Sequence, residues 1–555
     1  MKKNYQIVIG ILICLCLAGF AYLWATNLMQ SLYNYRSPIS NTPPTPGEST
    51  GFSITSKVVI ILIDALRVDT AYNSKVMPFL NKLRIDSASG IMHSQTPSYS
   101  EPGWTTILTG AWPEISDGPA MNLDYANIYP FTQDNIFSAA HRYGLKTAIS
   151  GYYWFEKLLP PGSVDKGFYT DGEDDQADQE VLAAAMPWLH EDSLNLILIH
   201  IDQVDYAGHH QGGPQSNYWD EAATRADAIV NTIVNELDLA QDTILILSDH
   251  GQIDSGGHGG QEEVVLTEPY LFAGKSIKPG NFPDIQMVDI APTISVLLGL
   301  NIPAINQGQP LLEILEINAE KKSLVDAVIS NQQNQLLNAY SDAINQKVTL
   351  IENEAAVTSV QNSILIARNT RLKNEILKRV LIVFVFLGTC FIFMLRIKKR
   401  KILFSYLLTG ILFLMIFNFR YFVIDKHPYS LSWITSQNEL VTYITVTSII
   451  SFFISWLFFN IVTMTFVKSP QEISLNTLYI TISTIFLVGS PIYISFAING
   501  PLVSWTLPDM LSMYLAFLAL LQCMFIAVIG SALSVFSVPI HMAAQKFAGA
   551  YLNEN

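Results

Sequence analysis

The long apolar runs of this 555-residue chain lie at its two ends, with a polar segment of several hundred residues between them. Residues 6–27 carry no formal charge and are long enough for the roughly 20 apolar residues that a helix needs to cross a bilayer. Further apolar runs predict membrane-spanning helices over 380–395, 402–423, 440–466, 478–498 and 510–538. The sequence therefore predicts a multi-pass integral membrane protein with one N-terminal and about five C-terminal transmembrane helices.

The first run reads either as a cleavable signal peptide or as a retained anchor. Its apolar core exceeds the about 7 to 15 residues of a signal peptide, which favours an uncleaved anchor. Basic residues mark the cytoplasmic side of a membrane. Lys2 and Lys3 precede the first span. The turn after the second span is filled by Arg396, Lys398, Lys399, Arg400 and Lys401. We therefore expect both termini in the cytoplasm and the large polar segment outside it.

Composition excludes several classes of protein. With 32 Lys and Arg against 47 Asp and Glu, the net charge of −15 argues against a nucleic-acid partner, because such proteins need a basic face. Half of the residues are hydrophobic and 14% are charged, which excludes a disordered chain. The four cysteines, Cys14, Cys16, Cys390 and Cys523, all lie in apolar runs, so neither a disulfide framework nor cysteine-bound zinc is expected.

The chain divides into five parts by composition. We predict an N-terminal transmembrane anchor, a flexible linker, a large extracytoplasmic domain, an amphipathic helical stalk and a C-terminal multi-span domain, over 1–28, 29–51, 52–318, 319–378 and 379–555. The linker is rich in Pro, Ser, Thr and Gly. Apolar residues recur at helical spacing in the stalk, which favours packing on the domain or on itself over a partner-binding coiled coil.

Three β-rich runs in the polar segment each end in a polar cluster, at 57–67, 194–210 and 243–252. Continuous runs of Val, Ile and Leu indicate strands buried on both faces, and helical patterns lie between them. We therefore expect an α/β fold with a mostly parallel sheet. Ligands of such sheets bind beyond the carboxyl ends of the strands. Asp64, Asp205, His209, Asp249 and His250 all fall there.

These residue types favour a metal site. Asp205 and His209 are four residues apart, Asp249 and His250 are adjacent, and His258 follows within the glycine-rich sequence GGHGG. Carboxylate oxygens and imidazole nitrogens suit zinc, with manganese as the alternative. Gathering these groups at one sheet edge is unfavourable unless a cation lies between them. His200 and His210 are assigned no role, because a strand histidine or a doubled histidine more often packs or supports a ligand.

The motifs DALR, SYSEPGWTTILTG, DYAGH and SDHG followed by GGHGG resemble the alkaline phosphatase superfamily, over roughly Lys57 to Gly274. The likeness is to its type I phosphodiesterase and nucleotide pyrophosphatase branch and, in layout, to the GPI ethanolamine-phosphate transferases. It implies a sheet flanked by helices and two divalent ions, zinc or manganese, on either side of a hydroxyl nucleophile. One ion would be held by Asp64, Asp249, His250 and the nucleophile, and the other by Asp205, His209 and His258.

The nucleophile that the resemblance implies is Ser100, with Thr96 and Ser98 as alternatives. The family pattern places it two residues before Pro-Asn or Pro-Gly and nine before the Thr of Thr-Gly, which Pro102-Gly103 and Thr109 satisfy. Nucleotide pyrophosphatases commonly have Asn after this proline, so Gly103 argues against a nucleotide substrate. Sulfatases, which share the fold, need Arg where this chain has Trp104.

The resemblance implies a metal-dependent phosphodiesterase or phosphatase that acts outside the membrane on a phosphate ester, through a phosphoseryl intermediate. The first alternative is a phosphoethanolamine-type transferase that moves a lipid headgroup to a lipid-linked or glycan acceptor. The second, of a different class, is a catalytically inactive membrane-anchored binding protein. The acidic polar segment favours a zwitterionic lipid headgroup over a polyanion as substrate, and membrane lipids are the expected partners.

Overall fold

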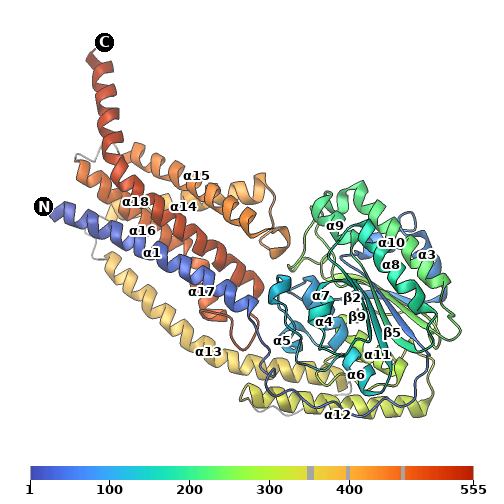
Figure 1. The fold of residues 1–555 in the computed structure, drawn as a ribbon. Helices are drawn as coiled ribbons and strands as arrows, with labels where there is room; N and C mark the ends of the chain where they lie inside the picture. The colour runs from blue at the N-terminus through green and yellow to red at the C-terminus, as the bar shows by residue number, and fades with distance from the viewer. Residues whose placement is uncertain (1, 347–355, 396–399, 435, 464–468, 554–555) are drawn as a thin grey trace.

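The computed structural model describes residues 2–346, 356–395, 400–434, 436–463 and 469–553. Figure 1 shows an α/β domain beside a bundle of long helices, with α12 (Ala319–Ala343) lying along the domain and α13 (Ala356–Leu395) running from the domain along the bundle. Helix α1 (Lys2–Tyr33) begins, and α18 (Met510–Asn553) ends, at the end of the bundle that points away from the domain.

The sheet of the α/β domain has nine strands within the described residues, in the order β4-β3-β5-β1-β6-β7-β2-β8, with β9 paired to β2. The strands are β1 (Val58–Ile63), β2 (Ala88–His93), β3 (Lys146–Tyr152), β4 (Lys166–Thr170), β5 (Leu194–Ile201), β6 (Thr243–Leu247), β7 (Thr267–Gly274), β8 (Gly280–Asn281) and β9 (Ile285–Gln286). β7 is antiparallel to both neighbours, and every other pairing is parallel. The mostly parallel α/β sheet that the sequence predicts is confirmed.

Both faces of the sheet are covered because alternate residues of β1 point to opposite sides. Val58, Ile60 and Leu62 belong to one apolar cluster, and Val59, Ile61 and Ile63 belong to the other. The first cluster includes residues of α4 (Ser100–Thr109), α6 (Ile136–Arg142), α7 (Trp154–Leu158) and α11 (Ile290–Leu298), and the second includes residues of α3 (Pro78–Leu83), α8 (Asp175–Leu189), α9 (Gln203–His210) and α10 (Asn217–Asn235). The sheet is therefore the middle of three layers.

Five helical segments among the described residues are long and apolar enough to cross a membrane: Lys3–Tyr33, Phe404–Ile424, Asn438–Asn460, Pro470–Asn499 and Met510–Ser537. They belong to α1, α14 (Arg400–Asn418) with the π-helical turn Phe419–Ile424, α15 (Gln437–Thr463), α16 (Pro470–Val488) with α17 (Ser490–Asn499), and α18. The chain is thus an integral membrane protein.

The span expected over 380–395 is not among these five. It forms the last part of α13, where Glu375, Lys378 and Arg379 directly precede the apolar stretch and shorten it. Exposed apolar side chains, including Phe384 and Ile382, still line this part of the helix. The basic turn used to predict orientation includes residues 396–399, which lie outside the described residues.

The segment predicted as a flexible linker makes close contacts with the domain. Helix α1 continues to Tyr33, and Tyr35 and Ile39 are buried just after it. Arg36 Nε and Nη2 donate to the two carboxylate oxygens of the buried Asp117, at 3.0 and 2.6 Å. These contacts join the anchor helix directly to the α/β domain.

The two helices of the predicted stalk differ in what they contact. α12 buries Val325 in the main apolar cluster of the domain, and Leu336 and Tyr340 pack beside α5 (Pro113–Ser116). α13 joins the same small cluster through Ile364 before it continues along the bundle. The stalk therefore packs on the domain through α12 and through the first part of α13, while residues 347–355 lie outside the described part of the chain.

Candidate active site

Parallel strands bring the predicted metal-binding residues to one edge of the sheet. Asp64 follows β1 directly, and Asp249 and His250 follow β6. Helix α9 begins two residues after β5 and carries Asp205 and His209. Because β1 lies between β5 and β6 and is parallel to both, the carboxyl ends of all three strands point the same way.

Asp64, Asp249 and His250 form the first group. Each offers a ligand atom, and these atoms all lie within 4.8 Å of one another. His250 Nε2 is 3.3 Å from Asp64 Oδ1 and 3.6 Å from Asp249 Oδ2. The Ala65 N–H donates to the other Asp249 oxygen at 3.2 Å and fixes that carboxylate. All three ligand side chains are buried.

Asp205, His209 and His258 form the predicted second group, whereas the ligand atoms that all lie within 4.8 Å of one another there are those of Asp205, His258 and His250. His209 Nε2 lies 3.5 Å from Asp205 Oδ2, and His258 Nε2 lies 3.7 Å from Asp205 Oδ1. The Nε2 atoms of His209 and His258 are 3.0 Å apart. The ring of His258 stacks on that of His250 at 3.9 Å between centroids, so the two groups adjoin.

Ser100 is the first residue of α4 and faces the first group. Its Oγ is 3.3 Å from His250 Nε2, and Asn122 Nδ2 donates to it at 3.4 Å. Ser98, the neighbouring hydroxyl, instead donates to the Gly260 carbonyl at 2.9 Å, and its own carbonyl lies 3.1 Å from His258 Nδ1. The structure thus brings all seven predicted site residues together and places Ser100, rather than Ser98, at the head of the helix beside His250.

The charges of the site are poorly compensated by protein groups alone. Burial, followed by the neighbouring carboxylate of Asp249, raises the pKa of Asp64 well above its usual range. Burial also raises the pKa of Asp249, and burial together with His250 holds the pKa of His258 well below its usual range. Burial opposes ionisation of Asp205, yet nearby His209 and His258 lower the pKa of Asp205 overall.

The residues present fit divalent metal ions. Asp64 Oδ1 and Asp249 Oδ2 are buried and accept no hydrogen bond, although both face His250. Buried carboxylate oxygens without partners are costly, and a cation between them removes that cost. Two imidazole nitrogens that converge on one carboxylate, as in the second group, also match the donor set of zinc.

Several supporting residues were missed by sequence reasoning. His200 Nε2 lies 2.9 Å from Asp64 Oδ2, and burial lowers the pKa of this imidazole to about 3. Gln252 Nε2 lies 2.5 Å from Asp205 Oδ1, and Asn122 orients Ser100. Asp202 forms a further possible ligand group with Asp64 and His200. The position of His200 at the end of a strand could have indicated its role beside Asp64. Nothing in the sequence indicates a role for Asn122 or Gln252.

Gly103 lies against the backbone of Asp249. A Cβ at this position would be 2.9 Å from the Asp249 carbonyl oxygen and 3.0 Å from its Cβ. We predict that Gly103→Ala lowers turnover by about 10²-fold, because displacing a ligand by even 1 Å is costly. Steady-state kinetics and metal content check this result. Gly47→Ala, whose Cβ meets nothing within 4 Å, is the matched control, and equal turnover of the two variants would contradict the prediction.

A loop between membrane helices supports the loop that carries His258. Ser432 Oγ donates to Glu262 Oε2 at 2.7 Å and accepts from the Gly260 N–H at 3.0 Å. Ser430 Oγ donates to the same carboxylate oxygen at 3.0 Å. A Cβ on Gly257 would lie 2.1 Å from the Ser432 carbonyl oxygen, so the two loops are in direct backbone contact. The membrane part therefore shapes one wall of the site.

We expect Ser432→Ala to weaken zinc binding by about 10-fold, a loss typical of residues that support metal ligands. The change removes the two hydrogen bonds of the Ser432 hydroxyl and leaves the bond from Ser430 to Glu262 and every predicted ligand in place. Zinc competition with a chelator measures the effect. Ser504→Ala, at an exposed serine of another loop in the membrane part, is the control. Equal zinc affinity in the two variants would show that the contact between the loops does not position His258.

The family whose model matches this chain is described as type I phosphodiesterase / nucleotide pyrophosphatase, and the match covers residues 58–116 and 125–367. The human GPI ethanolamine phosphate transferase 3, catalytic subunit, is 28% identical over 300 residues, covering 48% of this chain and 27% of that protein. The transferase 2 from Candida glabrata is 26% identical over 328 residues, covering 50% and 39%. The chain thus spans well under half the length of each of these two relatives.

Solved structures that match part of this chain include murine ectonucleotide pyrophosphatase / phosphodiesterase 5, with a TM-score of 0.37 at 12% identity over 44% of this chain and 96% of that one. Another is the alkaline phosphatase PafA, with a TM-score of 0.38 at 13% identity over 47% of this chain and 99% of that one.

Proposed function

The chain belongs to the type I phosphodiesterase / nucleotide pyrophosphatase family, and from this premise we propose that it is a metal-dependent phosphoryl-transfer enzyme that acts through Ser100 on a phosphate ester. One observation carries the proposal. The Ser100 hydroxyl lies at the start of a buried helix, 3.3 Å from His250, beside carboxylates whose free oxygens have no protein partner.

The proposed ligand groups are Asp64, Asp249 and His250 with Ser100 for one ion, and Asp205, His209 and His258 for the other. Divalent ions bound there would lower the pKa of the serine hydroxyl and stabilise charge on the leaving oxygen. His200 holds Asp64 and Gln252 holds Asp205, so both carboxylates are oriented before substrate arrives. Zinc is the proposed metal, with manganese as the alternative.

Side chains of the protein position the nucleophile for the reaction. Asn122 holds the Ser100 oxygen through its Nδ2 and accepts from the Glu101 N–H through its Oδ1 at 3.0 Å. Ser100 Oγ bonds to phosphorus as the bond to the leaving alcohol oxygen breaks, and the serine proton ends on that alcohol. Water or a second alcohol then takes the phosphoryl group and returns a proton to Ser100. No separate general base is assigned.

Transfer of ethanolamine phosphate is the second candidate. Its support is the name of the relatives and the contact between the Ser432 loop, which joins two membrane-spanning helices, and the His258 loop. With phosphatidylethanolamine, Ser100 would take phosphoethanolamine and release diacylglycerol. An alcohol on a lipid-linked or glycan acceptor would then receive the group. A hydrolase of soluble esters has no need of such a contact.

Turnover of bis-p-nitrophenyl phosphate, p-nitrophenyl phosphate and labelled phosphatidylethanolamine, with and without alcohol acceptors, separates these candidates. Diester cleavage to water identifies a phosphodiesterase. Little hydrolysis, with headgroup transfer to an added acceptor, identifies a transferase. Purified protein that retains two metal ions and turns over none of these substrates would favour an inactive binding protein and would contradict both proposals.

We also propose that both termini are cytoplasmic and that the α/β domain lies outside. Basic residues near the first span support this orientation, as does the common end of the bundle at which α1 begins and α18 ends (Figure 1). A cysteine introduced at the exposed Lys322 should react with an impermeant maleimide on intact cells, and one at Lys3 should not. The reverse pattern would overturn the orientation.

A further inference from the structure

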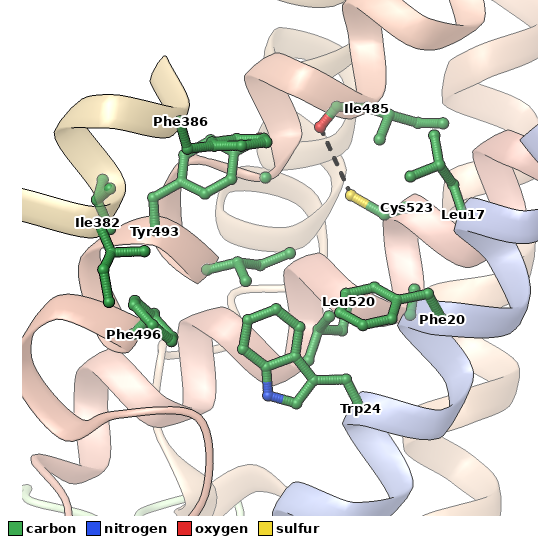
Figure 2. Close-up of a pocket in the computed structure, with 14 residues that line it drawn as sticks. Leu17, Phe20, Trp24, Ile382, Phe386, Ile485, Tyr493, Phe496, Leu520 and Cys523 are labelled. Carbon is green, nitrogen blue, oxygen red and sulfur yellow. Dashed lines mark hydrogen bonds between the residues drawn. The ribbon is translucent and has the colours of Figure 1, made fainter. Parts of the chain in front are cut away.

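An apolar cavity of about 350 Å³ lies between membrane helices, lined by residues of α1, α13, α16, α17 and α18. Figure 2 shows Leu17, Phe20 and Trp24 of α1 opposite Ile382 and Phe386 of α13, with Phe496 of α17 beside them. We propose that this cavity binds one acyl chain of a membrane phospholipid. Binding of an acyl chain in this cavity does not depend on the chemistry proposed for Ser100.

The polar atoms of the lining are already engaged by the protein. Trp24 Nε1 donates to the Pro501 carbonyl at 2.7 Å, and Cys523 Sγ donates to the Ile485 carbonyl at 3.6 Å. The Tyr493 hydroxyl lies 3.5 Å from the Phe486 carbonyl. Water needs two or more polar partners to occupy a cavity, and an apolar cavity of only about 150 Å³ already accepts benzene. A larger cavity of this kind favours a hydrocarbon ligand.

The surroundings of the cavity identify the hydrocarbon as lipid. Phe20 and Ile382 line the cavity and yet are 60% and 58% exposed, as are their neighbours Leu23 (59%) and Phe384 (75%). Exposed apolar side chains on membrane helices contact acyl chains, because the bilayer core is their solvent. The cavity therefore adjoins a surface at which acyl chains are already the neighbouring molecules.

The position of the cavity along the helices indicates which leaflet of the bilayer supplies the acyl chain. Trp24 is nine residues before Tyr33, the domain-side end of α1, or about 13 Å at 1.5 Å per residue. Arg379 lies one turn before Ile382 on the domain side, where it bonds Glu375 at 2.5 Å and the Ile498 carbonyl at 3.1 Å. Polar groups thus replace the apolar lining on the side toward the α/β domain. The acyl chain therefore enters from the leaflet that faces this domain.

The test uses full-length protein in nanodiscs that contain phosphatidylethanolamine with a diazirine in one acyl chain. After irradiation, mass spectrometry of the peptides maps the labelled residues. We expect label concentrated on the cavity-lining residues of α1, α13 and α17, above the level at lipid-exposed positions elsewhere on α1. Cavity labelling no higher than at those exposed positions would overturn the proposal.

Leu17→Trp fills the cavity and should reduce its labelling to the level of the exposed positions. Leu15→Trp makes the same change at an α1 residue that is 47% exposed and does not line the cavity, and it should leave the labelling intact. Ala21→Leu, a smaller filling change, provides a second variant if Leu17→Trp fails to fold. If a folded variant with a filled cavity is labelled as strongly as the unchanged protein, an acyl chain does not occupy the cavity.

Discussion

Replacing Ser100 with alanine is expected to lower phosphodiester turnover by at least about 10³-fold, because removing a covalent nucleophile leaves only binding and electrostatic stabilisation. The reason is local. Ser100 Oγ faces His250 and is held by Asn122 at the start of α4. Steady-state kinetics with bis-p-nitrophenyl phosphate measures the loss, and metal analysis should still find about two ions per chain.

The control for this variant is Ser98→Ala, the same change two residues earlier. Ser98 donates to the Gly260 carbonyl, so we expect a much smaller loss from slight movement of the His258 loop. If Ser100→Ala stays active while Ser98→Ala or Thr96→Ala is inactive, the nucleophile lies elsewhere in this segment. That outcome would overturn the assignment of Ser100.

Removing a ligand of the second group should lower metal content as well as activity. We expect Asp205→Asn and His258→Ala each to weaken metal binding by more than about 100-fold, since even supporting residues cost 10- to 100-fold. Asp205 contacts both His209 and His258, so its loss removes the negative charge shared by the whole group. Metal analysis after dialysis against a chelator is the measurement.

His210→Ala is the matched control for these ligand variants, because His210 is adjacent to His209 on the same helix. Its ring packs against Tyr206 at 4.7 Å between centroids. It should retain full metal content. A metal loss in His210→Ala equal to that in His258→Ala, or none in either, would contradict the ligand assignment.

The sequence predicted the core of the site because its residues follow buried strands. Runs such as 57–67 and 243–252 identify parallel strands, and parallel strands bring their following residues to one edge. The antiparallel β7 was not predicted, since its apolar run looks like that of a parallel strand. Asn122 and Gln252 were missed for another reason. Their roles depend on contacts between distant segments, which a single sequence does not reveal.

The membrane part was less predictable than the α/β domain. Hydropathy located the N-terminal anchor and four later spans, because a bilayer crossing depends mainly on local composition. It did not reveal that α13 is one helix from the stalk into the bundle, nor that Ser432 contacts the His258 loop. Each of these features depends on packing between helices that are far apart in the chain.

Acid-quenched single-turnover reaction of the metal-loaded protein with bis-p-nitrophenyl phosphate tests the central claim most directly. Peptide mass spectrometry then locates any covalent adduct. The account predicts p-nitrophenyl phosphate on the Ser100 hydroxyl, formed as p-nitrophenol is released, and no adduct in Ser100→Ala. Release of p-nitrophenol without an adduct on any residue, or with an adduct on a residue other than Ser100, would contradict it.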